Sequence, residues 1–283
     1  MRYLVLGSSR MVGHTTALYL FEQGNEVVGF DQELSMEFPS VSGSVYDLDG
    51  LSEQVLHGKY DAVINCTAVV NNDAEQDKAS AVYINSFLPH YLEKITAGTE
   101  TVVVHRSTDC VFSGKRGMYG PEDVPDGSSF YARTKAIGEL VNQKDITIRT
   151  SLVGPNTDSN GADLLSWFMR QNGPVNGYLN AIWSGLTTIE FAREIDILVR
   201  QRAHGLLHCV PAESISKFAL LELFASCMPG DRQVLPIDNE RMDKSLLPAL
   251  NGAELEIPSY KAMIREMAEW IDSHKHLYPH YYK

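Results

Sequence analysis

The sequence predicts an α/β fold, with a doubly wound parallel sheet in the first half of the chain and a smaller α/β unit in the second. Short β-rich runs alternate along the chain with helix-like segments. Within each run the residues are mostly apolar, with no alternation of apolar and polar positions. After Arg149 the composition and the spacing of these segments change. Strands that are apolar throughout are typical of a sheet covered by helices on both faces. The runs are YLVL at 3–6, EVVGF at 26–30, AVIN at 62–65, TVVVH at 101–105 and ITIR at 146–149.

Helical spacing of apolar residues fills two intervals between these strands, at 14–23 and 79–96. After Arg149, stretches rich in Gly, Asn and Asp separate further helical patterns, in which Ser216 and Ser259 are the expected N-caps. These later helices are expected at 188–200, 216–227 and 260–274, the last with an apolar face of Met263, Ile264, Met267, Trp270 and Ile271.

The different sequence patterns before and after Arg149 predict two domains. We expect the first over residues 1–150 and the second mainly over 151–283, completed by one or two strands around 206–210. Some segments, such as 186–210, are expected to return to the first domain.

Composition excludes several classes of partner. The formal net charge of -12 disfavours nucleic acid and anionic membranes, because both polyanions repel an acidic protein at long range. No apolar run reaches the length of a membrane span, and the four cysteines are widely scattered, which favours a reducing compartment and predicts a cytoplasmic protein. No metal is expected, because His204, His208 and the His-rich C-terminal tail lack carboxylate or cysteine partners at ligand spacing.

The first strand-to-helix turn has the features of a dinucleotide-binding loop. In GSSRMVG at 7–13, Gly7 permits a tight turn and Gly13 lets the following helix pack closely on the sheet. The N-terminus of that helix offers N–H groups to a pyrophosphate, and Asp31 stands where a carboxylate binds an adenosine ribose. The alternative is an ordinary strand-to-helix turn that contains two glycines, followed by an aspartate in a second turn. The position of the loop at the first strand-to-helix turn favours a Rossmann-type NAD(P)-binding domain.

Two further motifs point to carbonyl chemistry. In FYARTK, Tyr131 and Lys135 stand four residues apart, on one face of a predicted helix. A lysine ammonium lowers the pKa of a nearby phenol, which can then protonate a carbonyl oxygen as hydride reaches the carbon. Thr108 and Asp109 follow the fifth strand, at the sheet edge where open α/β folds bind ligands.

Together these motifs resemble the extended short-chain dehydrogenase/reductases, and within them the dTDP-4-dehydrorhamnose reductase group of nucleotide-sugar reductases. The resemblance covers nearly the whole chain and is carried by GSSRMVGH, VINCTA, STDCVFSG, FYARTKAIGE and IRTSLVGP. It implies an NADH- or NADPH-dependent enzyme that reduces the 4-keto group of a nucleotide-linked deoxysugar for cell-surface polysaccharide synthesis. The sugar nucleotide would bind between the Rossmann domain and the smaller C-terminal domain, and a homodimer is left open.

The resemblance also assigns residues. It implies that Tyr131 is the acid, that Lys135 is its electrostatic partner and the ribose anchor, and that Thr108 shares the substrate carbonyl. Asn85 supports the lysine through the helix backbone and water. The implied cofactor contacts are Gly7, Arg10, Met11, Val12 and Gly13 at the pyrophosphate, Asp47 and Leu48 at the adenine, and Thr67 and Ala68 beneath the cofactor.

Two positions depart from the family pattern. Arg10 replaces the usual middle glycine and brings a cation that suits a 2′-phosphate, whereas Asp31 repels such a phosphate, so the choice between NADH and NADPH stays open. Cys110 stands where the reductases have tyrosine and the related dehydratases glutamate, which disfavours a dehydratase. Its thiol is either a structural group or the acid/base of an epimerase-reductase.

Substrate contacts are harder to assign from the sequence. We expect Thr108 and Asp109 at the substrate, and Trp183 either stacked on the nucleotide or buried between the domains. Cations for the diphosphate are sought among Lys115, Arg116, Arg133 and Arg149. An epimerase, an epimerase-reductase and a non-catalytic dinucleotide-binding regulatory subunit remain as alternatives.

Overall fold

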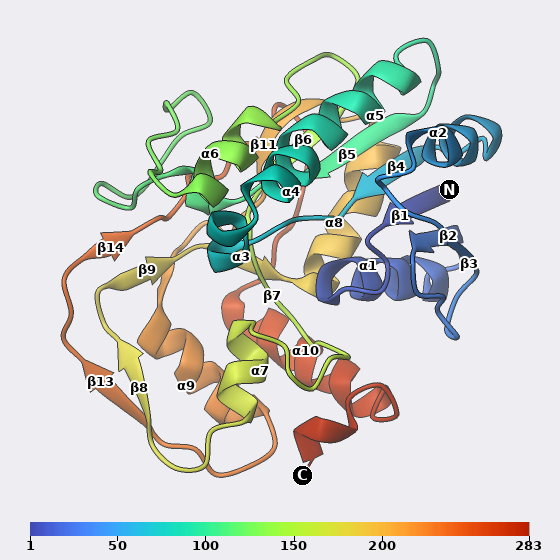
Figure 1. The fold of residues 1–283 in the computed structure, drawn as a ribbon. Helices are drawn as coiled ribbons and strands as arrows, with labels where there is room; N and C mark the ends of the chain where they lie inside the picture. Colours follow the sequence, from blue (N-terminus) through green and yellow to red (C-terminus); the bar gives the residue numbers. More distant parts are fainter. Residues whose placement is uncertain (283) are drawn as a thin grey trace.

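The computed structural model describes residues 1–282 and contains a seven-stranded sheet in which every neighbouring pair of strands is parallel (Figure 1). The order is β11-β6-β5-β4-β1-β2-β3, so the chain moves outward from β1 first in one direction and then in the other. This doubly wound arrangement confirms the predicted Rossmann-type fold, and the five predicted strands are present within one residue at each end. The strands are β1 (Arg2–Leu6), β2 (Glu26–Asp31), β3 (Ser40–Ser42), β4 (Ala62–Asn65), β5 (Val102–Arg106), β6 (Ile146–Arg149) and β11 (Gly205–His208).

Helices cover both faces of this sheet. On one face α1 (Met11–Glu22) packs against α8 (Thr188–Arg200), and on the other lie α2 (Leu48–His57), α5 (Leu88–Thr96) and α6 (Phe130–Ile137) (Figure 1). Buried side chains form a separate apolar cluster on each face, which is why the strands read as uninterrupted apolar runs. The helix expected at 79–96 is divided into α4 (Lys78–Val82), a π-helical turn (Tyr83–Phe87) and α5, and the short α3 (Asn71–Gln76) precedes it.

Within residues 151–282, three small sheets and three of the four α-helices lie beside the carboxyl edge of the large sheet. Ser216 and Ser259 cap α9 and α10 as predicted, because each hydroxyl accepts a hydrogen bond from the N–H three residues later. The elements are β7 (Ser151–Val153), α7 (Leu164–Met169), β8 (Val175–Tyr178), β9 (Ala181–Trp183), β10 (Gly185–Thr187), β12 (Ile215–Ser216), α9 (Lys217–Cys227), β13 (Val234–Ile237), β14 (Met242–Asp243) and α10 (Tyr260–Ser273).

The strand around 206–210 was expected either to complete the smaller unit or, as part of 186–210, to return to the first domain. The strand predicted at 206–210 is β11, which pairs in parallel with β6 at the edge of the seven-stranded sheet. It therefore does not complete the smaller unit, and the preceding helix α8 also lies on the large sheet, packed against α1. The amphipathic pattern identified both elements, but only long-range strand pairing decides which sheet receives an edge strand.

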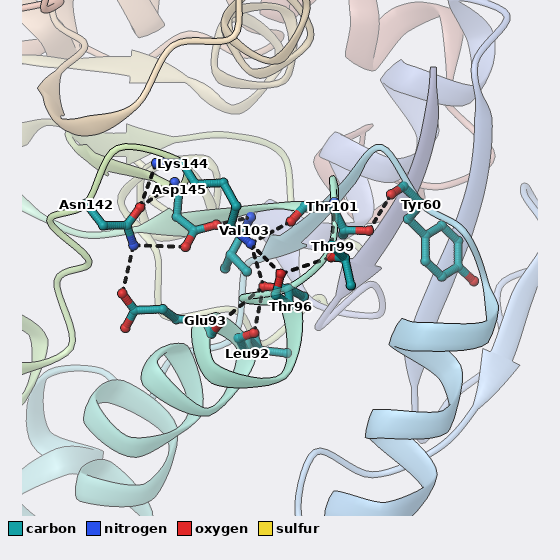
Figure 2. A network of polar contacts seen from close by, with 10 residues as sticks. All are labelled: Tyr60, Leu92, Glu93, Thr96, Thr99, Thr101, Val103, Asn142, Lys144 and Asp145. Carbon is teal, nitrogen blue, oxygen red and sulfur yellow. Dashed lines mark hydrogen bonds and ion pairs between the residues drawn. The ribbon is translucent and has the colours of Figure 1, made fainter.

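A network of hydrogen bonds joins α5, β5 and the start of β6 at the amino edge of the sheet (Figure 2). The Lys144 ammonium donates hydrogen bonds to Thr96 O and to Thr101 O, at 2.8 and 2.9 Å. The carboxylate of Asp145 accepts a hydrogen bond from Val103 N at 2.9 Å. Lys144 thereby caps the C-terminus of α5 and ties it to β5, at the end of the strands opposite the ligand-binding edge. No helix within residues 1–282 is long and apolar enough to cross a membrane.

Candidate functional site

The loop between β1 and α1 is shaped by its two glycines. Gly7 has a φ of +77°, a conformation that favours glycine, and its carbonyl accepts a hydrogen bond from Arg10 N at 3.1 Å. A Cβ on Gly13 would lie 2.1 Å from Gly7 O, so the first turn of α1 rests directly on the loop. The first N–H groups of α1 have no partner within the helix and lie just after the carboxyl end of β1, where a helix N-terminus can bind a pyrophosphate.

A cleft of about 1090 Å³ opens at this edge, between the large sheet and the second half of the chain. It lies where the strand order reverses between β1 and β4, the usual ligand position in open α/β sheets. Ten of the predicted site residues line it: Gly7, Arg10, Met11, Val12, Asp31, Thr67, Ala68, Thr108, Asp109 and Tyr131. Gly13, Asp47, Leu48, Asn85, Lys135 and Trp183 are not among the lining residues.

Asp31 holds the loop as well as facing the cleft. Its carboxylate accepts hydrogen bonds from Ser9 N at 3.1 Å, from Ser9 Oγ at 2.7 Å and from Gln32 N at 2.8 Å. The exposed Arg10 begins the next helix, and no ion pair between Arg10 and Asp31 forms within residues 1–282. The glycine loop, the helix N-terminus and a carboxylate at the end of β2 together fit a dinucleotide.

The two residues predicted to contact the adenine lie just outside the lining of the cleft. Asp47 caps α2, because its carboxylate accepts a hydrogen bond from Gly50 N at 3.1 Å, and Leu48 is the first residue of that helix. The cleft is lined instead by the segment 43–46 just before them, which includes the half-exposed Tyr46. Tyr46 stacks on Tyr83 with 4.7 Å between ring centroids.

The candidate proton donor lies deep in the cleft. Ser129 caps α6, which places Tyr131 in the first turn beside the end of β5, and only 6% of this tyrosine is exposed. Burial raises the pKa of the Tyr131 phenol to about 12, while the charge of Arg106 and a hydrogen bond with Thr108 lower it. The Thr108 hydroxyl donates to Asp109 Oδ1 at 3.1 Å and accepts from Cys110 N at the same distance. The structure thus brings together the predicted phenol and hydroxyl.

Lys135 lies one helical turn from Tyr131, but its side chain is directed at β5. Nζ lies 2.6 Å from Arg106 O and 3.1 Å from His105 Nε2, and the side chain is fully buried. Burial, and next the charge of Arg106, place the pKa of the Lys135 ammonium well below its ordinary value. His105 and Arg106 were not predicted as site residues, although two basic residues at the end of the apolar strand VVVHR were a visible signal.

Asn85 forms hydrogen bonds that join backbone segments around the site. Its amide nitrogen donates to Val69 O at 2.8 Å and to Thr134 Oγ1 at 3.1 Å, while its amide oxygen accepts from Val69 N at 3.0 Å. It lies in the π-helical turn, a local irregularity that often marks functional sites. Asn85 therefore joins the loop after β4 to α6 through Thr134, and it makes no direct hydrogen bond to Lys135 within the described residues.

Several side chains considered as substrate contacts have partners within the protein. Trp183 is buried, packs against Tyr260 and carries the Lys217 ammonium over its ring at 5.1 Å. Arg149 forms a buried ion pair with Glu139 and is not among the cleft-lining residues. Arg116 pairs with Asp123 on the surface, and neither Lys115 nor Arg133 is among the cleft-lining residues.

Cys110 does line the cleft, next to Thr108. Burial, followed by the charge of Asp109, raises the pKa of its thiol to about 11, although the Lys244 ammonium lies 3.6 Å from Sγ. A thiol with so high a pKa stays protonated at neutral pH, so almost no thiolate is present to act as a base. Within residues 1–282 no cluster of three or more His, Cys, Asp and Glu side chains is arranged to hold a metal ion.

Comparisons with known proteins agree with this geometry. The family model described as "RmlD substrate binding domain" matches residues 1–277. A Haloferax volcanii protein named "Probable low-salt glycan biosynthesis reductase Agl14" is 31% identical over 53% of this chain and 52% of its own length. The dTDP-4-dehydrorhamnose reductase of Mycobacterium tuberculosis is 27% identical over 67% of this chain and 66% of its own, so these alignments span about half to two thirds of the relatives.

The fold is also known from crystal structures. That of dTDP-4-dehydrorhamnose reductase from Bacillus anthracis, in complex with NADP, superimposes with a TM-score of 0.79 at 21% identity and covers 96% of this chain and 99% of its own. At that identity the likeness concerns the fold. The family match, which spans nearly the whole chain, is the stronger finding, and by it this protein belongs to the RmlD substrate binding domain family.

Proposed function

We propose that this protein is an NAD(P)H-dependent reductase of the 4-keto group of a nucleotide-linked deoxysugar. The observation that carries the proposal is one cleft lined by the glycine loop, by Asp31 and by the Tyr131 phenol next to the Thr108 hydroxyl. A dinucleotide loop alone would suit any Rossmann protein, and a phenol alone would suit many sites. Their meeting in one cleft supports hydride transfer coupled to proton transfer.

In this proposal each residue has a defined task. The N–H groups of residues 7–13 bind the pyrophosphate, and Asp31 accepts hydrogen bonds from the adenosine ribose. The reduced nicotinamide, when bound, supplies a hydride to the carbonyl carbon. Tyr131 gives its phenolic proton to the carbonyl oxygen, so ketone and hydride become an alcohol and the phenolate later regains a proton from solvent. The Thr108 hydroxyl turns its proton from Asp109 Oδ1 to the same oxygen, donates a second hydrogen bond to it and orients it.

Two groups in the cleft bear on the choice between NADH and NADPH. Both oxygens of Asp31 already accept hydrogen bonds from the loop and from Gln32, which fixes a negative charge at the ribose end. Arg10 is exposed beside it, with no ion pair within residues 1–282 that would hold its guanidinium away from a 2′-phosphate. We therefore propose that the protein accepts both cofactors.

The substrate part of the proposal rests on the far wall of the cleft. That wall comes from the second half of the chain, at 150–152 and at 156–164, and leaves room for a second ligand beside the cofactor. The relatives named as a glycan biosynthesis reductase and as a dTDP-4-dehydrorhamnose reductase support a nucleotide sugar and a role in polysaccharide synthesis. The four free cysteines suit a reducing compartment, and we place the reaction in the cytoplasm.

The test is a substrate panel. The protein is incubated with NADH or NADPH and with dTDP-, UDP- and GDP-linked 4-keto-6-deoxysugars, and the absorbance of the reduced nicotinamide is followed. We expect oxidation of the cofactor with at least one sugar and one alcohol formed per cofactor oxidised. Absence of oxidation with every member would overturn the proposal and favour a dinucleotide-binding regulatory subunit. Solvent deuterium at carbon 3 or 5 of the product would instead identify an epimerase-reductase.

A further inference from the structure

The far wall of the cleft contains a loop, residues 154–163, that has neither helix nor strand and connects β7 to α7. Its cleft-lining members are Asn156, Thr157, Asp158, Ala162 and Asp163. The carboxylate of Asp163 accepts hydrogen bonds from Ser166 N and from Asn156 Nδ2, both at 2.9 Å. These bonds close the far-wall loop on itself, and its distance from the glycine loop must be set by another part of the chain.

Tyr281 holds the far-wall loop from a distant part of the sequence. Its phenolic oxygen lies 3.0 Å from Asn156 N and 3.0 Å from Ser166 Oγ in α7, and Tyr281 is only 4% exposed. A backbone N–H can only donate, so the phenolic oxygen accepts from Asn156 and its own proton is free to bond Ser166 Oγ. One buried hydroxyl thus joins the start of the loop to the helix that follows it.

The residues before Tyr281 lie along α1, the helix that begins at the glycine loop. His274 Nε2 lies 2.8 Å from Glu22 Oε1 at the end of α1. Four residues further on, Tyr278 is fully buried, and burial raises the pKa of its phenol to about 12 against hydrogen bonds that include one with Thr15. Because Thr15 lies in the first half of α1, this segment follows α1 back toward its N-terminus.

Tyr278 and Tyr281 lie on the same side of one short turn. The 3₁₀ turn Pro279–Tyr282 follows Tyr278 directly, and side chains three residues apart lie over each other in such a turn. Their rings are stacked, with 6.0 Å between centroids and 14° between planes. Tyr278 contacts α1 and Tyr281 binds the far-wall loop, so this turn connects the helix of the glycine loop to the opposite side of the cleft.

We propose that Tyr281 is a positioning residue for the second ligand of the cleft: its hydroxyl holds the far-wall loop, and the turn that carries it sets the distance of that loop from α1. This inference rests on the proposed function, which places the sugar nucleotide against this wall. Without the hydroxyl the loop samples further positions, and a ligand that fits one of them binds in proportion to the fraction of molecules that hold it. The bound complex restores the parent geometry, so the rate of the chemical step stays the same.

The first experiment tests the far-wall loop in the ligand-free full chain. Tyr281→Phe keeps the ring and its stacking on Tyr278 and removes only the hydroxyl. Hydrogen–deuterium exchange of the backbone, read by mass spectrometry, should become about two- to tenfold faster in peptides that cover residues 154–166, because the net contribution of one hydrogen bond corresponds to about that factor. Peptides that cover residues 7–31 should exchange at the parent rate, since Tyr278 still contacts α1.

The second experiment separates positioning from a merely structural role. With the 4-keto-6-deoxysugar nucleotide that the parent reduces, Tyr281→Phe should raise KM for the sugar nucleotide about two- to tenfold, while kcat and the dissociation constant of NADH stay within about twofold of the parent. Tyr282→Phe is the matched control, because Tyr282 lies in the same turn but is 40% exposed, and its hydroxyl bonds to Asp272 and not to the loop. It should leave exchange and kinetics at the parent values.

The inference is overturned by unchanged exchange at 154–166 in Tyr281→Phe, by an equal rise at 7–31, or by an unchanged KM. Ser166→Ala removes the other partner of the hydroxyl and is the second variant should Tyr281→Phe not fold; it should raise exchange in the same peptides. Absence of turnover with every sugar would overturn the proposed function, and the role of Tyr281 toward the substrate with it. The exchange measurement needs no ligand, so it decides independently whether Tyr281 holds the far-wall loop.

Discussion

Gly13→Ala is the sharpest test of the cofactor loop. An added Cβ would lie 2.1 Å from Gly7 O and 2.7 Å from Gly7 C, whereas ordinary van der Waals contacts begin at 3.4 Å. These are backbone atoms, so a rotamer change cannot relieve the clash, and α1 and the loop must move apart. Overpacking of this kind costs about 1–3 kcal/mol. If the dinucleotide has to restore the parent geometry, its affinity falls between about fivefold and a hundredfold.

The assay is a fluorescence titration with NADH and NADPH, together with a thermal melt of each variant. Gly98→Ala is the matched control, because Gly98 is exposed and an added Cβ there meets nothing within 4 Å. We expect Gly98→Ala to bind both cofactors within about twofold of the parent. Unchanged affinity in Gly13→Ala, with a melt that shows a folded protein, would refute the assignment of residues 7–13 as the pyrophosphate loop.

Three further predictions concern charge and stability. Lys144→Met removes the hydrogen bonds to the Thr96 and Thr101 carbonyls, so the free energy of unfolding measured in urea should fall by about 1–3 kcal/mol while the dinucleotide affinity stays unchanged. The exposed Lys94→Met is the control and should change neither quantity. Asp31→Asn keeps an acceptor for Ser9 but removes the negative charge, so the ratio of NADPH affinity to NADH affinity should rise about fivefold, or about 1 kcal/mol. A constant ratio would place the 2′-phosphate away from Asp31. Burial lowers the pKa of His208 from 6.5 to about 4, so as the pH falls the unfolded chain takes up a proton on this histidine before the folded protein does. The free energy of unfolding should therefore be highest above pH 6.5 and fall between pH 6.5 and pH 4, by at most about 1.4 kcal/mol per pH unit. His208→Gln should flatten that slope, and an equally steep slope in the variant would assign the effect to other groups.

The sequence was most informative where a local signal determines the structure. Apolar runs identified the five central strands, and the hydroxyls of Ser216 and Ser259 marked two helix starts. In each case the physical cause is a contact within a few residues or a face-wide burial pattern. The edge strand β11 had the same local signal, but its partner β6 lies more than fifty residues away in the chain, and only packing selects it.

Side-chain direction was the part that the sequence could not supply. The spacing of Tyr131 and Lys135 sets them on one face of α6, yet the rotamer of Lys135 depends on His105 and on the Arg106 carbonyl across the sheet. Trp183 shows the same limit, since an aromatic beside a glycine-rich turn suits a ligand platform and a buried seam equally well. Asp47 capped a helix instead of lining the cleft because an aspartate before a helix satisfies free N–H groups first.

The central claim is that Tyr131 supplies the proton as a keto sugar is reduced, and one variant tests it most directly. Tyr131→Phe removes the phenolic oxygen and little else from a side chain that is almost fully buried. With the 4-keto-6-deoxysugar that the parent reduces, we expect Tyr131→Phe to bind NAD(P)H within about twofold of the parent and to lose at least about a hundredfold in the rate of cofactor oxidation. Turnover at the parent rate in Tyr131→Phe would contradict the mechanism.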